Sequence, residues 1–229
     1  MSATKKLNPA AHPNWSQVPF QAAPCLKILP RRFFARDPRL VAPELLGRVL
    51  LRRSEGLVLA GRIVELEAYL GAADAAAHST AGKTARNSVL FGEPGHAYVY
   101  FVYGVHYCLN ISCMPDGNAG CVLVRALEPL AGIDTMASLR GTIVPGSLRA
   151  RRLLTSGPGR LCQAFGVTRQ LDNGKDLTSP SSDLQIVDDG VDRGRVLRGP
   201  RVGIRKAAAA RLRYALAGNP FVSAKPLPG

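Results

Sequence analysis

A carboxylate and an aromatic ring stand two positions apart at the end of one predicted strand. Glu67 and Tyr69 close the segment Arg62–Tyr69, in which apolar and polar residues alternate. Side chains two apart on a strand share a face, so both can reach into one pocket. Glu65 lies on the same face. From the residues alone, either carboxylate could deprotonate a water as a general base.

A second aromatic segment, Tyr98-Val-Tyr100-Phe-Val-Tyr103, ends at Gly104, where a hairpin is expected to turn. Tyr103 would then project from the hairpin tip. Flat rings beside a carboxylate suit a pocket that holds a planar base taken out of a duplex. The two segments together therefore predict an enzyme that acts on a flipped base.

The charge of the chain favours a nucleic-acid partner. Its 30 Lys and Arg residues outnumber 16 Asp and Glu, which gives a net charge of +14. Arg supplies 23 of the 30 cations, and guanidinium pairs bidentately with phosphate. A genome rich in G and C would also favour Arg over Lys, but it would not explain the excess of positive charge.

Cysteine and histidine residues lack the spacing of a metal site. The five cysteines form no Cys-x-x-Cys pair, and the four histidines stand apart at positions 12, 78, 96 and 106. We therefore disfavour a metal-dependent hydrolase and expect no cofactor. Thiols in apolar runs indicate a reducing compartment, which would be the cytoplasm of a bacterium or the nucleus of a eukaryote.

The length of 229 residues predicts one core with a tail. We expect residues 1–27 to be a flexible basic tail, because they hold Lys5 and Lys6 and lack the apolar stretch of a secretory signal. Residues 28–229 should form a single domain. The apolar runs are too short to cross a bilayer, so we expect no membrane contact, and we predict a monomer.

The pattern of elements predicts a mixed fold. Asp37-Pro38 begins a helix that ends at Gly47, and further helical segments are expected at 130–140, 147–154 and 156–165. Strands are expected at 48–53, 57–66, 97–103, 106–113, 120–127, 184–187, 201–204 and 211–217. We therefore predict an α/β (mixed α+β) domain with a curved, mostly antiparallel sheet, a protruding β-hairpin and surrounding short helices.

Several motifs occur together in one order: Glu65–Gly71, Ala77-His78-Ser79, Arg86-Asn87, Pro94–Gly104, Asn110 and Arg125–Pro129. In this order they resemble the alkyladenine (3-methyladenine) DNA glycosylase family, over roughly residues 29–223. The resemblance implies a base-excision-repair enzyme that flips alkylated purines, with deaminated purines as a second class, out of duplex DNA. It would hydrolyse the N-glycosidic bond and leave an abasic site. The run Lys206–Ala210 departs from the bulkier sequence of the family.

The resemblance implies catalytic roles for two residues. It selects Glu67 rather than Glu65 as the base that activates water, and it makes Arg125 a partner in holding that water. Arg125 lies in an apolar run, where an unpaired guanidinium would be costly, so a structural ion pair is a compatible alternative. The resemblance also places the backbone carbonyl of Val202 near the water.

The resemblance further implies a pocket for the base. Tyr69, His78 and Tyr100 would form its walls, and electron-rich rings attract cationic alkylated purines. Asn110 would oppose the exocyclic amine of normal guanine, although a buried Asn that ties down a turn remains an alternative. Tyr103 would intercalate and fill the space that the flipped nucleotide leaves.

We expect contacts with the DNA backbone from small, polar and cationic residues: Lys83, Thr84, Arg86, Gly159, Arg160 and Arg151. A helix start with small residues offers free N–H groups to phosphate. Clustered arginines are weaker evidence, because such runs are usually solvated faces.

No lysine lies in the strand of Glu67, so we predict a monofunctional purine glycosylase without lyase activity. The alternative is a non-catalytic module that binds damaged DNA or structured RNA on the same fold. The paired presence of Glu67 and Arg125 favours the enzyme. The sequence does not rank 3-methyladenine, 7-methylguanine, hypoxanthine and ethenoadenine as substrates.

Overall fold

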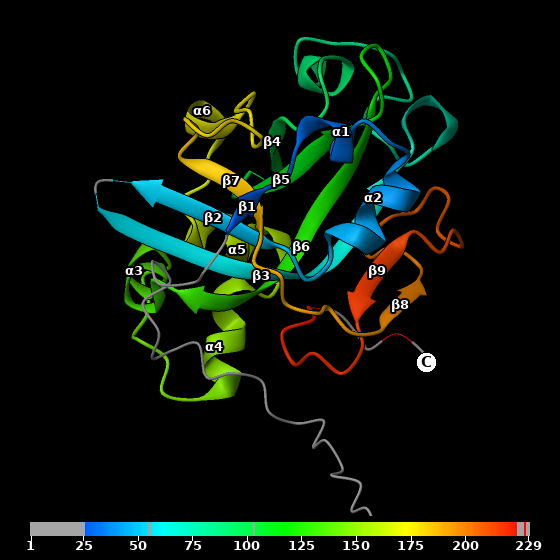
Figure 1. The fold of residues 1–229 in the computed structure, drawn as a ribbon. Coiled ribbons are helices and arrows are strands. Elements are labelled where there is room, and N and C mark those ends of the chain that lie inside the picture. The colour runs from blue at the N-terminus through cyan, green and yellow to red at the C-terminus, as the bar shows by residue number, and fades with distance from the viewer. Residues whose placement is uncertain (1–25, 55, 103, 224–226, 228–229) are drawn as a thin grey trace, which may run out of the picture.

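The structure is a computed structural model that describes residues 26–54, 56–102, 104–223 and 227. Its centre is a sheet in which every described strand pairing is antiparallel (Figure 1). The strands are β1 (Lys27–Ile28), β2 (Val49–Ser54), β3 (Leu57–Tyr69), β4 (Ala97–Val102), β5 (His106–Cys113), β6 (Gly120–Ala131), β7 (Leu184–Asp188), β8 (Val196–Gly199) and β9 (Arg213–Leu216). They follow the order β1-β7-β2-β3-β6-β5-β4, with β9 also paired to β3 and β8 paired to β9.

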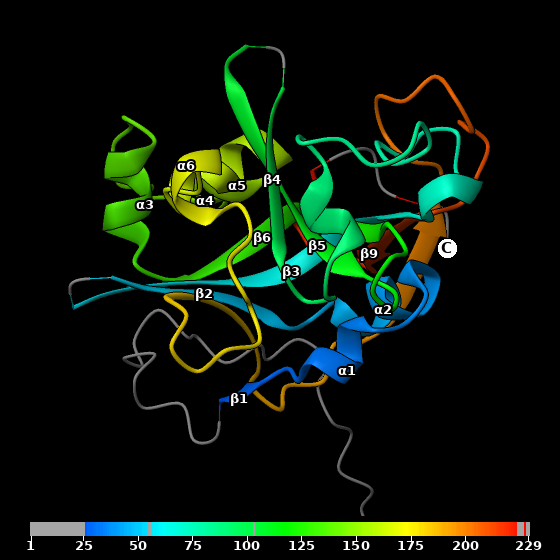
Figure 2. The same cartoon turned by 90° about the horizontal axis from the view of Figure 1, so that it is seen from above.

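Short helices surround the sheet, which confirms the expected mixed α/β single domain. They are α1 (Arg31–Phe34), α2 (Pro38–Leu45), α3 (Ile133–Leu139), α4 (Leu148–Thr155), α5 (Pro158–Ala164) and α6 (Arg169–Asp172), with 3₁₀ turns η3 (Gly71–Ala73) and η4 (Ser88–Phe91). Helices α3 to α6 gather on one side of the long strands β2 and β3 (Figure 2). As expected, Asp37 caps α2, accepting a bond of 2.8 Å from the Arg39 amide.

Strand β3 carries the predicted catalytic segment and is covered along both edges. One edge pairs with β6, while the other pairs first with β2 and then with β9. Register breaks on either side of Glu65 mark an irregularity in the β3–β6 ladder. Such breaks bend a strand and re-aim its side chains, and they are frequent beside active sites. Residues 65–67 are therefore held between two neighbouring strands.

The hairpin of β4 and β5 projects from the body of the domain, as expected (Figure 2). At its end the described chain resumes at Gly104, whose φ of 69° is the left-handed conformation that glycine adopts readily. Val105 beside it is 67% exposed. Tyr103, the predicted intercalating residue, lies outside the described residues, as do residues 1–25 of the predicted tail. Strand β1 begins at Lys27, one residue before the predicted start of the domain.

Two expected elements differ in the structure. Residues 130–140 are not one helical segment, because β6 continues to Ala131 and Gly132, with a φ of 76°, separates it from α3. Residues 201–204 are not a strand. Strand β8 ends at Gly199, just before Pro200. The Arg201 side chain and the Val202 amide instead bond to Asp74 and Glu67, at the site described below. The run 206–210 forms a largely exposed turn outside the cavity lining.

Candidate active site

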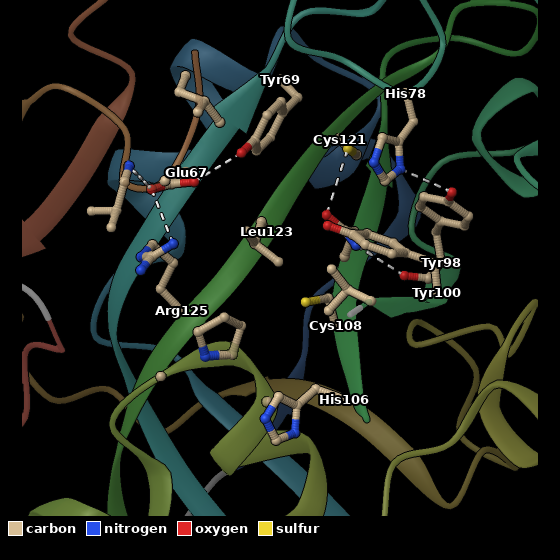
Figure 3. A pocket seen from close by; sticks show the side chains of 18 of the residues that line it. Glu67, Tyr69, His78, Tyr98, Tyr100, His106, Cys108, Cys121, Leu123 and Arg125 are labelled. Atoms are coloured by element: carbon tan, nitrogen blue, oxygen red, sulfur yellow. Dashed lines mark hydrogen bonds and ion pairs between the residues drawn. The ribbon is translucent and has the colours of Figure 1, made fainter. Parts of the chain in front are cut away.

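A cavity of about 560 Å³ opens between β3, β5, β6 and the start of α5 (Figure 3). Ten of the residues predicted from the sequence line it: Glu67, Tyr69, His78, Arg86, Tyr100, Asn110, Arg125, Gly159, Arg160 and Val202. Lys83, Thr84 and Arg151 are not among the lining residues. The cavity thus gathers the predicted catalytic and pocket residues from segments far apart in the chain.

Glu67 is fully buried at one wall of the cavity, where it accepts two hydrogen bonds and forms one ion pair. Its Oε1 accepts from the Val202 amide at 2.7 Å and lies 3.2 Å from Nη1 of Arg125. Its Oε2 accepts from the Tyr69 hydroxyl at 2.9 Å. Burial raises the pKa of Glu67, against the lowering effects of Arg125 and the Val202 N–H. A carboxylate poised in this way suits a general base.

Glu65 occupies a different environment, although it shares the face of β3. It is fully buried, it does not line the cavity, and its Oε1 accepts from Nε of Arg125 at 3.3 Å and Nε of Arg213 at 2.7 Å. Its Oε2 accepts from the Ser223 amide at 2.6 Å. Glu65 therefore holds Arg125, and Arg125 in turn contacts Glu67. The geometry leaves Glu67 as the carboxylate that faces the cavity.

Aromatic rings face each other across the cavity. Tyr69 lies on the side of Glu67, whereas His78 and Tyr100 lie opposite, with Leu123 between the two groups (Figure 3). The rings of His78 and Tyr100 meet edge to face with centroids 4.4 Å apart. Nδ1 of His78 lies 3.2 Å from the Tyr98 hydroxyl. Burial and, to a lesser extent, Arg86 lower the pKa of His78, so its ring is neutral near pH 7.

Asn110 lies on β5 at the cavity surface. Its Nδ2 donates to the Tyr98 carbonyl at 3.2 Å, and its Oδ1 lies 3.9 Å from the Cys121 thiol. Asn110 is thus bonded to the neighbouring strand β4 and also lines the cavity. Burial raises the pKa of Cys108, and it raises the pKa of Cys121 to about 12. Both lining thiols therefore stay protonated and neutral.

The start of α5 is joined directly to the strand that carries Arg125. The Gly157 amide donates to the Arg125 carbonyl at 3.0 Å. At Gly159 an added Cβ would lie 2.8 Å from Cγ of His106, so a side chain there would collide with the ring. Arg160 and His106 are exposed at this rim. The hairpin and α5 therefore meet at the mouth of the cavity.

The phosphate-contact candidates separate into two groups. Arg86 lines the cavity, donates from Nη2 to the Phe101 carbonyl at 3.3 Å and lies 5.7 Å from the Tyr100 ring centroid. Lys83 and Thr84 are exposed on the preceding loop. Arg151 lies on α4, away from the lining. Arg86, like Gly159 and Arg160, therefore adjoins the cavity. Lys83, Thr84 and Arg151 could reach DNA only on the surface around the cavity.

Sequence reasoning missed other lining residues, including Cys108, Cys121, Leu123, Ser156 and Ile204. Among the described residues, no group of three or more His, Cys, Asp or Glu side chains could hold a metal ion. In the same part of the chain, no helix is both long and apolar enough to cross a membrane.

Comparison with known proteins places this chain in a family. Residues 32–220 match the family model described as methylpurine-DNA glycosylase. The chain belongs to this family. A methylpurine-DNA glycosylase acts on DNA, hydrolyses an N-glycosyl bond and serves base excision repair, so the resemblance seen in the sequence is confirmed.

Curated relatives of the methylpurine-DNA glycosylase family are similar over most of their length. A protein of Koribacter versatilis is 64% identical over 197 residues, covering 86% of this chain and 93% of its own. A protein of Burkholderia lata is 47% identical, with 86% and 91% covered. One from Clostridium botulinum is 44% identical, with 86% and 99% covered. All three bear the name "Putative 3-methyladenine DNA glycosylase".

Proposed function

We propose that this chain removes alkylated purines from duplex DNA with a water that Glu67 activates. The observation that carries the proposal is the buried carboxylate of Glu67, fixed by Arg125, the Val202 amide and the Tyr69 hydroxyl at the cavity wall. A water proton passes to Glu67 while the water oxygen bonds to C1′ of the sugar. The C1′–N bond breaks, and its electron pair leaves with the base.

The aromatic walls suit the proposed substrate. Tyr69 on one side and His78 with Tyr100 on the other can hold a flipped purine between flat faces. A neutral His78 does not repel a cationic base, and the tyrosine rings attract it. An alkylated purine that already carries positive charge leaves readily, so the proposal requires no separate proton donor. Asn110, at the cavity surface, would oppose the exocyclic amine of guanine.

Water, rather than an amine of the protein, is the proposed nucleophile. The described lysines, at positions 27, 83, 175 and 206, do not line the cavity. A Schiff base with C1′ would need a lysine amine within bonding reach. We therefore propose a monofunctional enzyme, acting as a monomer, that releases the base and leaves the DNA strand intact.

The proposal is tested by base release from duplexes that each carry one lesion: 3-methyladenine, 7-methylguanine, hypoxanthine or ethenoadenine. At equal enzyme concentration we expect release of at least one alkylated purine, with strand breakage only after alkali. Binding to lesion DNA without release of any base would favour the non-catalytic alternative. Strand breakage without alkali would contradict the monofunctional mechanism.

The rate of release should fall in acid through the titration of Glu67. A base must be deprotonated to accept a proton, so activity is present above the pKa of Glu67 and is lost as the pH falls through it. Because burial raises that pKa, the acid limb should lie above the ordinary carboxyl value of 4.5. The single-turnover rate on 7-methylguanine measures this limb, since that base is already cationic. A rate that stays constant down to 4.5 would exclude Glu67 as the titrating base.

Tyr103→Ala should weaken binding most where a pairing partner opposes flipping. Tyr103 is the next residue in the sequence after β4, a strand of the projecting hairpin, and we propose that its ring enters the base stack. Unstacking costs a few kcal/mol, least for a mispaired base. Affinity and single-turnover rate should be compared for one lesion opposite a pairing and a non-pairing base. Equal losses of affinity and rate opposite both bases would show that Tyr103 has no specific role in flipping.

Arg160→Ala provides the control for Tyr103→Ala, because Arg160 is exposed at the rim of the cavity. Loss of a phosphate contact should weaken binding to both duplexes alike and reduce the salt slope by about one per contact.

A further inference from the structure

Arg201 forms a buried ion pair directly behind the cavity. Its side chain has no exposed surface, and that of Asp74 is 2% exposed. Nη1 of Arg201 lies 2.5 Å from Oδ2 of Asp74, and Nη2 lies 2.8 Å from Oδ1, so the pair is bidentate. Nη1 also donates to the Ala68 carbonyl at 3.0 Å. The guanidinium thereby binds the backbone of β3 between Glu67 and Tyr69.

The same guanidinium covers one face of a pocket wall. Its Cζ lies 4.5 Å from the centroid of the Tyr69 ring. Arg201 does not line the cavity, whereas Tyr69 does, so the other face of the ring is left for a base. A cation held over an aromatic face attracts it electrostatically. Arg201 therefore restrains the ring plane of Tyr69 without touching the space in which a substrate would bind.

The Arg201–Asp74 pair is also connected to Glu67 and to the loop that carries His78. Val202, the next residue, donates its amide to Glu67 at 2.7 Å. Asp74 accepts from the amides of Leu70 at 3.2 Å and Ala76 at 3.1 Å, which fixes the loop that leads to His78. One ion pair thus connects the general base, one aromatic wall and the loop of the opposite wall.

We infer that Arg201, held by Asp74, is a positioning residue that aligns Tyr69 and the Val202 amide with Glu67. This inference rests on the proposed function, because it concerns the geometry of the attacking water and the base. Misplacement of reacting groups by about 1 Å can cost on the order of 10²-fold in rate. Lysine is a poor substitute, since its ammonium lacks the planar fork that makes two parallel bonds and stacks on a ring.

The chain offers a matched control in a second buried, bidentate ion pair. Arg62, also bonded to the backbone, contacts Asp189 at 3.2 and 2.8 Å, with side chains 9% and 6% exposed. Arg62 lies on β3, the strand of Glu67, but it does not line the cavity or contact Glu67, Tyr69 or Val202. Arg62→Lys therefore makes the same chemical change with a comparable loss of fold stability.

The experiment compares Arg201→Lys and Arg62→Lys with the wild-type chain under conditions in which all are folded by circular dichroism. We expect Arg201→Lys to lower the single-turnover rate of base release about 10²-fold. The rate of Arg62→Lys should stay within about 3-fold of wild type, although both variants unfold at lower urea concentration. An unchanged rate for Arg201→Lys, or an equal loss in both variants, would overturn the inference.

The pH profile adds a readout that a purely structural role would leave unchanged. Charged and titratable groups that act on Glu67 come from several segments: Arg125, Tyr69, Glu65, Cys108 and Arg201. The Val202 amide lowers the pKa of Glu67. If Arg201→Lys displaces that amide, the acid limb of the rate should move to higher pH, whereas the limb of Arg62→Lys should stay in place. An unmoved limb in Arg201→Lys would contradict the alignment of Val202.

Asp74→Asn decides the question if Arg201→Lys does not fold. This variant keeps the shape of the side chain and removes the charge that holds the guanidinium, so it should reproduce the rate loss and the moved acid limb. A wild-type rate in Asp74→Asn would overturn the inference. Failure of the wild-type chain to release any base would instead overturn the proposed function, and the inference with it.

Discussion

Glu67→Gln should lower the single-turnover rate of base release by about 10²-fold or more. The amide keeps the shape of the side chain, and its oxygen can still accept a hydrogen bond from the Val202 amide or the Tyr69 hydroxyl. It cannot take a proton from water, however. The affinity for lesion DNA should therefore change little, because the aromatic walls and the cationic rim are intact.

Binding and rate must be measured on the same folded sample, since Glu67 also contacts Arg125. Arg125 keeps Glu65 as a partner in this variant, which limits the loss of stability. Base release near the wild-type rate would show that another group activates the water. The residue to examine next would then be Glu65, the other carboxylate on this face of β3.

Glu65→Gln should mainly lower the stability of the fold, whereas Glu67→Gln should mainly lower the rate. Glu65 is fully buried between Arg125 and Arg213 and also accepts from the Ser223 amide. Removing one partner of a buried ion pair typically costs about 3–5 kcal/mol, because the remaining charge loses its compensation. Urea unfolding should show this loss in the free energy of unfolding.

Glu44→Gln is the control for Glu65→Gln. Glu44 pairs with Arg36 at 2.8 Å, but its side chain is 42% exposed. A pair in such contact with solvent contributes about 0–1 kcal/mol, so the control should unfold almost as the wild-type chain does. A Glu65→Gln variant of wild-type stability would show that Arg125 and Arg213 are held without this carboxylate.

Local patterns in the sequence predicted most of the elements. Asp37 and Pro38 begin a helix through local capping, and the alternation around Glu65 and Glu67 reflects a strand with a common face. Residues 201–204 were expected to form a short closing strand, but β8 ends at Gly199, just before Pro200. The backbone amide of Val202, two residues later, bonds to Glu67 rather than to a neighbouring strand.

The site could be predicted only in part, because its decisive contacts join distant residues. The strand pattern places Glu65 and Glu67 on one face, so it does not separate them. The family resemblance and the position of Glu67 at the end of the strand selected Glu67. In the structure, Arg213 and the Ser223 amide donate hydrogen bonds to Glu65, and Glu67 is the carboxylate that faces the cavity. Nothing local to Asp74 indicates its pair with Arg201, which lies 127 positions away in the chain.

Apolar lining residues were missed for a related reason. Cys121 and Leu123 alternate along β6 as core residues do, and both are almost fully buried. The cavity opens over this face of the sheet, so the pattern that predicts a core position also occurs at a pocket wall. The wall position is recognised only from the structure, in which Leu123 lies between Tyr69 and His78 (Figure 3).

The position of β9 beside β3 has a consequence for protein synthesis. A ribosome makes Glu65 long before its partners, since Arg213 follows 148 residues later and Ser223 follows 158 residues later. Val202, which donates to Glu67, follows that carboxylate by 135 residues. Contacts between such distant segments form slowly and late in folding. A nascent chain whose residues 202–223 are still inside the ribosome lacks the groups that hold Glu65 and Glu67, so catalytic competence arises only after this segment has emerged.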